Sequence, residues 1–221
     1  MTVAAPPETA SAPVTIQPDG LKGLLGLPDA PSGLVIFAHG SGSGRLSPRN
    51  NHVANGLRGA GLATLLIDLL TPLEEQDRTN VFDIPLLATR LAGAAAWARR
   101  EPALAHLPIG YFGASTGAGA ALLAASAEGA DVRAIVSRGG RPDLAGAHAL
   151  AHVRAPTLLI VGGRDKPVIE LNRVAMRHMH AAETELTIVP GANHLFEEPG
   201  TLDRVIAHAI RWFLLYLPET P

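Results

Sequence analysis

The feature that most constrains the fold is a repeated alternation of short apolar runs with longer stretches rich in Ala and Leu. The short runs have the length of strands buried on both faces and occupy residues 33–38, 62–67, 108–112, 134–137, 157–161 and 185–189. The longer stretches place apolar residues three and four positions apart, as helices do, over residues 48–60, 84–100, 115–127, 168–181 and 202–217. Because such alternation implies right-handed crossovers, it predicts an α/β fold with a mostly parallel central sheet and helices on both faces.

The N-terminal region departs from this alternation. Residues 14–16 and 21–27, joined through Pro-Asp-Gly, predict an antiparallel edge hairpin that feeds the first parallel strand. Residues 1–13 are rich in Ala, Pro, Thr and Ser without periodicity, which predicts a flexible tail. Since no internal repeat or second core is evident, residues 14–221 are expected to form a single domain.

Composition excludes several functional classes. The 221 residues are 47% hydrophobic and 17% charged, with a net charge of -2, so there is no basic field that would hold nucleic acid or anionic lipid. The absence of cysteine removes disulfides, thiol nucleophiles and thiolate metal sites. No segment reaches the roughly 18 consecutive apolar residues of a membrane span, and the N-terminus lacks a signal-peptide pattern. A cytoplasmic protein is therefore expected, and its oligomeric state, monomer or homodimer, stays open.

Functional residues are expected just after the apolar runs, because an open parallel sheet binds ligands at the carboxyl ends of its strands. The segment Gly113-Ala114-Ser115-Thr116-Gly117 follows one such run and precedes a helix of small residues. In this context G-x-S-x-G predicts a sharp, strained turn that exposes Ser115 as a nucleophile. The start of the following helix favours an oxyanion at the same point.

A serine hydroxyl also needs a base that takes its proton and an acid that orients the base. His194 follows the last strand and Asp165 follows the strand before it, so both are expected to meet Ser115 at neighbouring strand ends. Asp143 is a rival acid, but it follows a proline and is typical of a helix cap. Most other histidines, His39 among them, are assigned to packing or to solvent.

Catalysis further requires N–H donors aimed at the developing oxyanion. The amide of Thr116, next to the nucleophile, and the amide of Ser41, after the first central strand, are the candidates. Gly40 and Gly42 would let the backbone approach the substrate. The alternative, a phosphate cradle, is disfavoured because the loop contains neither G-x-x-x-x-G-K-[ST] nor a clean G-x-G-x-x-G.

Arg138 and Arg141 stand at a strand end near the predicted site and could bind a substrate carboxylate or phosphate. A purely structural role is favoured, since acidic partners are plentiful: Asp143, Glu197 and Glu198. The same ambiguity applies to Arg45 and Arg49.

No metal or cofactor is expected. His148 and His152 have the i, i+4 spacing of helical metal ligands but lack an acidic third ligand in the motif. Residues 69–80 form a polar insertion after a strand, for which a solvated loop is favoured over a gate above the site.

The chain resembles the α/β-hydrolase superfamily, and within it the dienelactone-hydrolase-like branch, over nearly all of residues 14–217. The resemblance rests on the motifs Phe37-Ala38-His39-Gly40-Ser41-Gly42-Ser43, Ser47-Pro48-Arg49-Asn50, Ser137-Arg138-Gly139-Gly140-Arg141-Pro142-Asp143 and His194-Leu195-Phe196-Glu197-Glu198-Pro199-Gly200. Relatives in this branch sometimes occur fused to phosphoribosyltransferase domains, and no such domain is expected in this chain. Dienelactone hydrolase proper uses a cysteine nucleophile, where this chain has Ser115.

The resemblance implies an α/β-hydrolase fold, and the residues predict a Ser115–His194–Asp165 triad that cleaves a small-molecule carboxylic ester or lactone through an acyl-enzyme. Residues 138–156 are too few for the large helical lid of lipases, so a minimal lid or none is expected. The same groups could serve a thioesterase or acyltransferase, because the triad fixes the intermediate rather than the acceptor. A non-catalytic binding protein of the same fold is the alternative from a different class.

Overall fold

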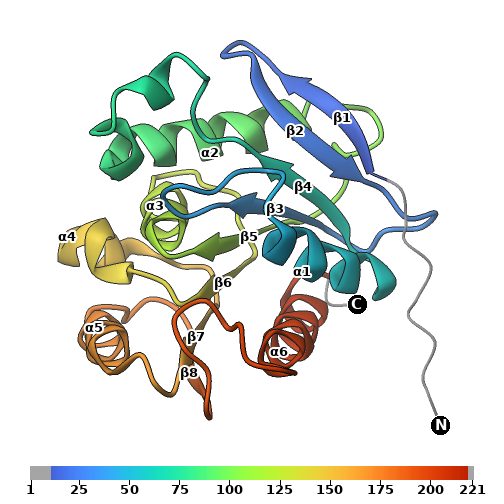
Figure 1. Ribbon diagram of the computed structural model, residues 1–221. Helices are drawn as coiled ribbons and strands as arrows, with labels where there is room; N and C mark the ends of the chain where they lie inside the picture. Colours follow the sequence, from blue (N-terminus) through green and yellow to red (C-terminus); the bar gives the residue numbers. More distant parts are fainter. Residues whose placement is uncertain (1–10, 219–221) are drawn as a thin grey trace, which may run out of the picture.

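The computed structural model describes residues 11–218, which form one sheet of eight strands in the order β1-β2-β4-β3-β5-β6-β7-β8 (Figure 1). The six parallel strands are β3 (Leu34–Ala38), β4 (Ala63–Ile67), β5 (Ile109–Ala114), β6 (Ala134–Arg138), β7 (Thr157–Gly162) and β8 (Thr184–Val189). The edge hairpin consists of β1 (Ser11–Ile16) and β2 (Leu21–Gly26), and β2 pairs antiparallel with β4. The predicted mostly parallel sheet with an antiparallel edge hairpin is confirmed.

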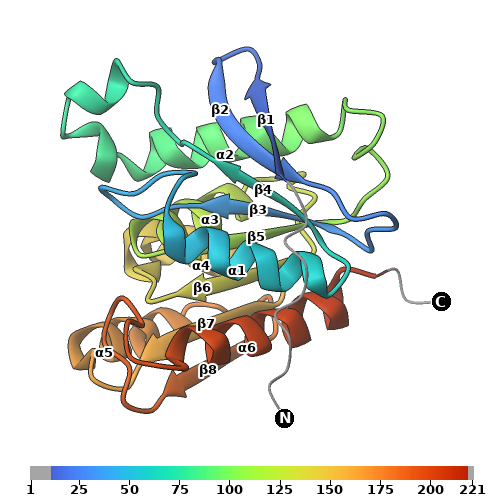
Figure 2. The same ribbon diagram turned by 45° about the vertical axis from the view of Figure 1, so that its right-hand side comes forward.

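Both faces of the sheet are covered (Figure 2). Successive residues of β3 point to opposite sides, as the pleat requires: Ile36 lies in one core cluster and Val35 and Phe37 in the other. Helices α1 (Pro48–Gly59) and α6 (Thr201–Tyr216) cover the face of Val35. The opposite face is covered by α2 (Ile84–Ala98), α3 (Thr116–Ala125), α4 (Gly146–His152) and α5 (Lys166–Met176). Strands buried on both sides explain why their sequences are continuously apolar.

Local signals start the helices where the sequence predicts. The Ser47 hydroxyl accepts from the Asn50 amide and caps α1, and the Asp83 carboxylate accepts from the Leu86 amide and caps α2. Each cap is followed by a proline in the first turn. The start of α1 matters for function because it faces the candidate site.

Several element boundaries differ from the prediction by a few residues, and two short elements between β6 and β7 were not predicted. Residues 11–13, assigned to the tail, belong to β1, where Ser11 pairs with Gly26; the rest of the predicted tail lies outside the described residues. The periodicity also missed a short 3-10 helix, Pro142–Ala145, and α4, because together they span too few residues for a clear period. These elements occupy the region that is too short for a large lid, and both pack beside α3.

Within residues 11–218 the structure contains no helix long and apolar enough to span a bilayer. The predicted cytoplasmic location stays a prediction.

Candidate active site

Ser115 lies between the end of β5 and the start of α3, with φ 51° and ψ −120°. This conformation is strained for a residue with a side chain, and it turns the chain sharply from strand to helix. The turn needs small neighbours: a Cβ on Gly113 would lie 2.5 Å from Ala118 Cα, and one on Gly117 would lie 2.2 Å from the carbonyl oxygen of Ala38. The strained backbone predicted for G-x-S-x-G is confirmed.

Hydrogen bonds from the next strand end hold this turn. The amide of Ser115 donates to the carbonyl of Arg138 over 3.3 Å. The carbonyl of Ser115 accepts from the amides of Arg141, at 3.0 Å, and Ala118, at 3.1 Å. Hydrogen bonds from both its amide and its carbonyl therefore fix the backbone of Ser115 relative to the end of β6.

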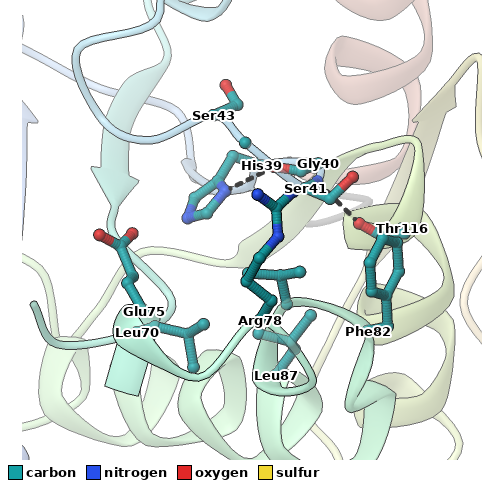
Figure 3. Close-up of a pocket in the computed structure, with 12 residues that line it drawn as sticks. His39, Gly40, Ser41, Ser43, Leu70, Glu75, Arg78, Phe82, Leu87 and Thr116 are labelled. Carbon is teal, nitrogen blue, oxygen red and sulfur yellow. Dashed lines mark hydrogen bonds between the residues drawn. The ribbon is translucent and has the colours of Figure 1, made fainter. Parts of the chain in front are cut away.

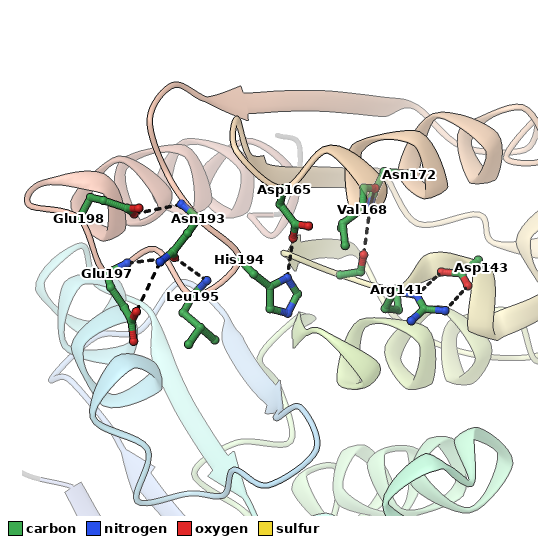
Figure 4. Close-up of polar contacts among 11 residues, drawn as sticks. Arg141, Asp143, Asp165, Val168, Asn172, Asn193, His194, Leu195, Glu197 and Glu198 are labelled. Atoms are coloured by element: carbon green, nitrogen blue, oxygen red, sulfur yellow. Dashed lines mark hydrogen bonds and ion pairs between the residues drawn. The ribbon is translucent and has the colours of Figure 1, made fainter.

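Asp165 and His194 are brought together from the loops after β7 and β8 (Figure 4). His194 Nδ1 lies 2.6 Å from Asp165 Oδ2, with side-chain exposures of 40% and 13%. Asp165 stands at the N-cap of α5, but its side chain makes no capping bond. Its carboxylate is thus directed to the imidazole, where it fixes the ring orientation and favours a proton on Nδ1.

The rival acid is engaged elsewhere. Asp143 binds the guanidinium of Arg141 through two contacts of 2.8 Å, from Nε and Nη2 (Figure 4). This hydrogen bonding raises the pKa of Arg141 above its ordinary value. Arg141 is therefore paired with Asp143, as one of its two interpretations requires, and the hydrogen bonds of residues 11–218 include none between Asp143 and His194.

The loop that carries His194 is braced by its neighbours. The amide of Asn193 donates to Glu198 Oε2 over 3.0 Å, and Asn193 Oδ1 accepts from the amide of Leu195 over 2.8 Å (Figure 4). Phe196 is buried just beyond, at a positive φ of 56°. These contacts hold the imidazole without using its Nε2 atom.

Ser115 and His194 line the same cavity of about 240 Å³. Gly40, Ser41 and Arg138 also line it. The hydrogen bonds of residues 11–218 include none between Ser115 Oγ and His194, so the catalytic roles of the three predicted triad residues stay predictions. Such contacts are often long before substrate binds.

The proposed oxyanion loop approaches Ser115 closely. A Cβ on Gly40 would lie 2.9 Å from Ser115 Cβ, so only glycine allows this approach. The amide of Ser41 donates to Thr116 Oγ1 over 3.0 Å, which aims it at the turn that carries the nucleophile (Figure 3). Gly42, at a φ of 69°, lies farther out and lines a second, larger cavity.

His39 is a residue of this loop that sequence reasoning missed. It is 8% exposed; its Nε2 accepts from the amide of Leu69 over 3.0 Å, and its Nδ1 lies 2.9 Å from the carbonyl of Gly40. Because Nε2 accepts, Nδ1 carries the proton and donates to Gly40. Burial lowers the pKa of His39 below 6.5, which favours this neutral form. Its position directly after a strand, the criterion that selected Ser115, was the available signal.

The second cavity, of about 510 Å³, is also lined by the oxyanion loop, from His39 to Ser43 (Figure 3). Gly40, Ser41 and Ser43 line both cavities. The polar insertion after β4 contributes to the lining of this second cavity. It contains two 3-10 helices, Glu74–Gln76 and Asn80–Phe82. Its apolar lining residues are Leu70, Val81, Phe82 and Leu87. The favoured interpretation of residues 69–80 as a solvated loop is therefore incomplete, because part of this segment shapes a cavity beside the site.

Within residues 11–218 no group of three His, Asp or Glu side chains is placed to hold a metal ion. The helical pair His148 and His152 has ring centroids 4.6 Å apart, and His152 Nδ1 bonds the carbonyl of His148. This pair lies on α4, away from Ser115.

Comparisons with known proteins agree on the fold. No protein-family model matches the chain. A crystal structure of dienelactone hydrolase from Anabaena variabilis is 55% identical, with a TM-score of 0.89 over 94% of this chain and 97% of that one. Est1E from Butyrivibrio proteoclasticus is 16% identical, with a TM-score of 0.76 over 93% of this chain and 98% of its own, which supports the fold alone.

Curated relatives carry a different name. Two Mycobacterium tuberculosis proteins, each named "Putative phosphoribosyl transferase", are 58% identical over 204 residues. The match covers 92% of this chain but only 46% of each relative, so the chain spans about half their length.

Proposed function

The chain belongs to the dienelactone-hydrolase-like branch of the α/β-hydrolase superfamily, and we propose that it is a serine hydrolase that cleaves carboxylic esters or lactones through an acyl-enzyme intermediate. One observation carries this proposal: His194, which is hydrogen-bonded to Asp165, lines the same small cavity as Ser115, and Ser115 stands on a strained turn. The transferase name of the mycobacterial relatives is not carried over to this chain, because the matched region is only 46% of each of those proteins.

In the proposed reaction Ser115 Oγ attacks the carbonyl carbon while His194 Nε2 takes its proton. His194 then gives this proton to the departing alcohol oxygen as the carbon–oxygen bond breaks, leaving the acyl group on Ser115. Water repeats the sequence and releases the carboxylic acid. Asp165 stays ionised throughout and stabilises the imidazolium through its 2.6 Å contact.

The negative charge on the carbonyl oxygen would be received by the amides of Thr116 and Ser41. The Ser41 amide already points at Thr116 Oγ1, so the substrate oxygen would compete with that hydroxyl for it. Gly40 and Gly42 are proposed to admit the small-molecule substrate. For Arg141 a substrate role is not retained, because Asp143 occupies its guanidinium.

Replacing Ser115 by Ala tests the proposal. A fluorophosphonate probe should label the unmodified protein once per chain, and the S115A variant should neither react nor hydrolyse p-nitrophenyl esters. Thermal unfolding of S115A checks that it folds. Labelling that persists at another residue would contradict the assignment.

A panel of oxygen esters, thioesters and short peptides with a common acyl group measures the preferred leaving group. Ester turnover above thioester turnover supports the esterase proposal, and the reverse order indicates a thioesterase. Absence of both labelling and turnover would favour a non-catalytic binding protein.

A further inference from the structure

Asn172 is a fully buried polar residue in the middle of α5 (Figure 4). Its side-chain amide donates to two carbonyl groups: that of Val168, one turn earlier in the helix, at 2.8 Å, and that of Gly140, after β6, at 3.0 Å. Because both neighbours are acceptors, only the NH2 end of the amide fits there. Its Oδ1 is buried without a partner within residues 11–218, which lowers stability. What the amide contributes is therefore its donation to the loop after β6.

The Gly140 carbonyl leads to the nucleophile turn. It shares a peptide group with the Arg141 amide, and that amide donates to the Ser115 carbonyl over 3.0 Å. The Ser115 carbonyl in turn shares a peptide group with the Thr116 amide, the proposed oxyanion donor. Two peptide groups joined by one hydrogen bond thus connect Asn172 to this N–H. Within residues 11–218, Asn172 is the only donor to the Gly140 carbonyl.

These hydrogen bonds all run in the same direction, so the peptide groups polarise one another. As the first residue of α3, Thr116 has no intrahelical acceptor for its amide, which leaves this N–H available to a substrate oxygen. Without the Asn172 donor the next peptide group would be free to rotate, and the Ser115–Thr116 peptide would follow it. The Ala118 amide would still hold the Ser115 carbonyl, so the oxyanion donor would be misaligned rather than lost.

The same bond joins the parts of the chain that carry the other two proposed triad residues. Asp165 stands at the N-cap of α5, the helix that contains Asn172. On the loop after β6, a Cβ on Gly139 would lie 3.5 Å from His194 Nδ1, so this loop packs against the imidazole. Asn172 therefore ties the helix of the proposed acid to the loop that contacts both the proposed base and the nucleophile turn.

We propose that Asn172 is a positioning residue that aims the Thr116 amide at the developing oxyanion through the two linked peptide groups. This inference rests on the proposed function, since it takes the Thr116 amide to receive the charge of the tetrahedral intermediate. An interaction that acts on the transition state alone changes kcat and kcat/KM equally. Loss of the Asn172 donor should therefore lower kcat and leave KM unchanged.

Asn172→Leu removes the donor and keeps the number and branching of side-chain atoms. Its kcat on a p-nitrophenyl ester, counted per chain that fluorophosphonate labels, should fall about tenfold, less than the roughly 10²–10³ of a lost oxyanion donor. KM should stay within about twofold of the unmodified value. A trifluoromethyl ketone gives a second measurement. Ser115 Oγ adds to its carbonyl carbon, the serine proton passes to His194, and the ketone oxygen becomes an oxyanion. Its Ki should rise about tenfold.

Thr157→Val is the matched control. Thr157 is also fully buried, and its hydroxyl also donates to one backbone carbonyl, that of Ala155, over 2.9 Å. It begins β7, whereas the candidate site lies at the opposite ends of the strands. Thr157→Val should lower the urea midpoint at least as much as Asn172→Leu, because the leucine also removes an unpaired buried oxygen. It should keep the unmodified kcat and ketone Ki.

Asn172→Ser provides the answer if the leucine variant does not fold. A serine hydroxyl in a helix bonds the carbonyl one turn earlier, here that of Val168, and is too short to reach Gly140. This variant should therefore show the same rise in ketone Ki. Because KM and Ki describe folded molecules only, a smaller folded fraction does not alter either constant.

The outcomes separate this inference from the proposed function. Unchanged kcat and Ki in a folded Asn172 variant would overturn the positioning role. A change in KM as large as that in kcat, or an equal loss of kcat in Thr157→Val, would also overturn it, since either indicates a general structural effect. If fluorophosphonate labels Ser115 of the unmodified protein and the ester is hydrolysed, the hydrolase proposal stands in each of these cases. If labelling and turnover are both absent there, both proposals fall.

Discussion

Two substitutions of His39 should rank differently in kcat and in stability: the variant that is less stable should have the higher kcat. Its Nδ1 donates to the carbonyl of Gly40 and its Nε2 accepts from the amide of Leu69. The Gly40 carbonyl belongs to the same peptide as the Ser41 amide, so holding the oxygen aims the N–H at the nucleophile turn. An asparagine at position 39 can place a donor near Nδ1, and a glutamine can place an acceptor near Nε2. Each variant therefore keeps one of the two hydrogen bonds.

The two losses differ in kind. His39→Asn leaves the Leu69 amide without its acceptor; Leu69 is fully buried, so about 1–3 kcal/mol of unfolding free energy should be lost. In His39→Gln the Gly40 carbonyl still accepts from the Ser43 amide at 3.2 Å, so the cost should be about 0.5–1.5 kcal/mol. The effect on kcat should be reversed, because only His39→Gln removes the His39 bond to the Gly40 carbonyl and leaves the Gly40–Ser41 peptide held by the Ser43 amide alone. Complete loss of an oxyanion donor costs about 10²–10³ in kcat, so a misaligned one should cost about tenfold or more.

The assay compares urea unfolding with kcat on one p-nitrophenyl ester under saturating substrate. We expect His39→Asn to be the less stable variant and to have a kcat about tenfold above that of His39→Gln, with little difference in KM. A kcat order that follows the stability order would show that His39 acts through folding alone. Equal kcat values would show that its bond to Gly40 does not position the Ser41 amide.

Three further outcomes follow from the site. Asp165→Asn should lower kcat by about 10²–10⁴ because the imidazole loses its orienting charge, whereas Asp143→Asn should change it less than tenfold, as ester kinetics will show. The free energy of unfolding of Ser115→Gly should exceed that of Ser115→Ala by about 1 kcal/mol in urea titrations, because glycine adopts the positive φ without strain. Equal unfolding midpoints would argue against strain at this turn. Burial lowers the pKa of His39, so its contribution to stability is fully present above 6.5 and is lost as the pH falls below it; His39→Gln should therefore show a shallower acid decline in Tm.

Most of the fold could be predicted because its strands are buried on both faces. A continuous run such as residues 157–161 reads as a strand regardless of the rest of the chain, and the structure extends it by one residue, to Gly162. Short elements escaped because their period is not repeated, as with α4. The start of β1 at Ser11 escaped for another reason: its residues Ser11, Ala12 and Pro13 are weak strand formers, and pairing with β2 overrides that preference.

The site was predictable where chain order alone decides position. Ser115, Asp165 and His194 each follow a strand, and parallel strands bring such ends together. Whether a strand-end residue faces the substrate or a neighbouring loop depends on side-chain direction, which the sequence does not contain. His39 was assigned to packing or to solvent because it precedes the Ser115 motif, although its bond from the Leu69 amide joins the loops after β3 and β4.

Arginine pairing was the least predictable property because it depends on which acids the loops bring within reach. The sequence supplies Asp143, Glu197 and Glu198, and the structure gives them to Arg141, Arg49 and Arg164 respectively. Arg138 is paired with none of them: it is buried at the last position of β6, and its Nε and Nη1 atoms have no hydrogen-bond partner.

The Gly40–Ser41 peptide links these features. Its carbonyl is held by His39 and Ser43, its N–H is aimed at the nucleophile turn, and its two residues line both cavities. In the proposed reaction, a scissile ester bound at Ser115 would therefore lie between the two cavities, at the point where the Ser41 amide is proposed to receive the oxyanion. Any side chain at position 40 would both collide with Ser115 and displace this boundary, so substrate choice and rate should be altered together by Gly40→Ala rather than separately.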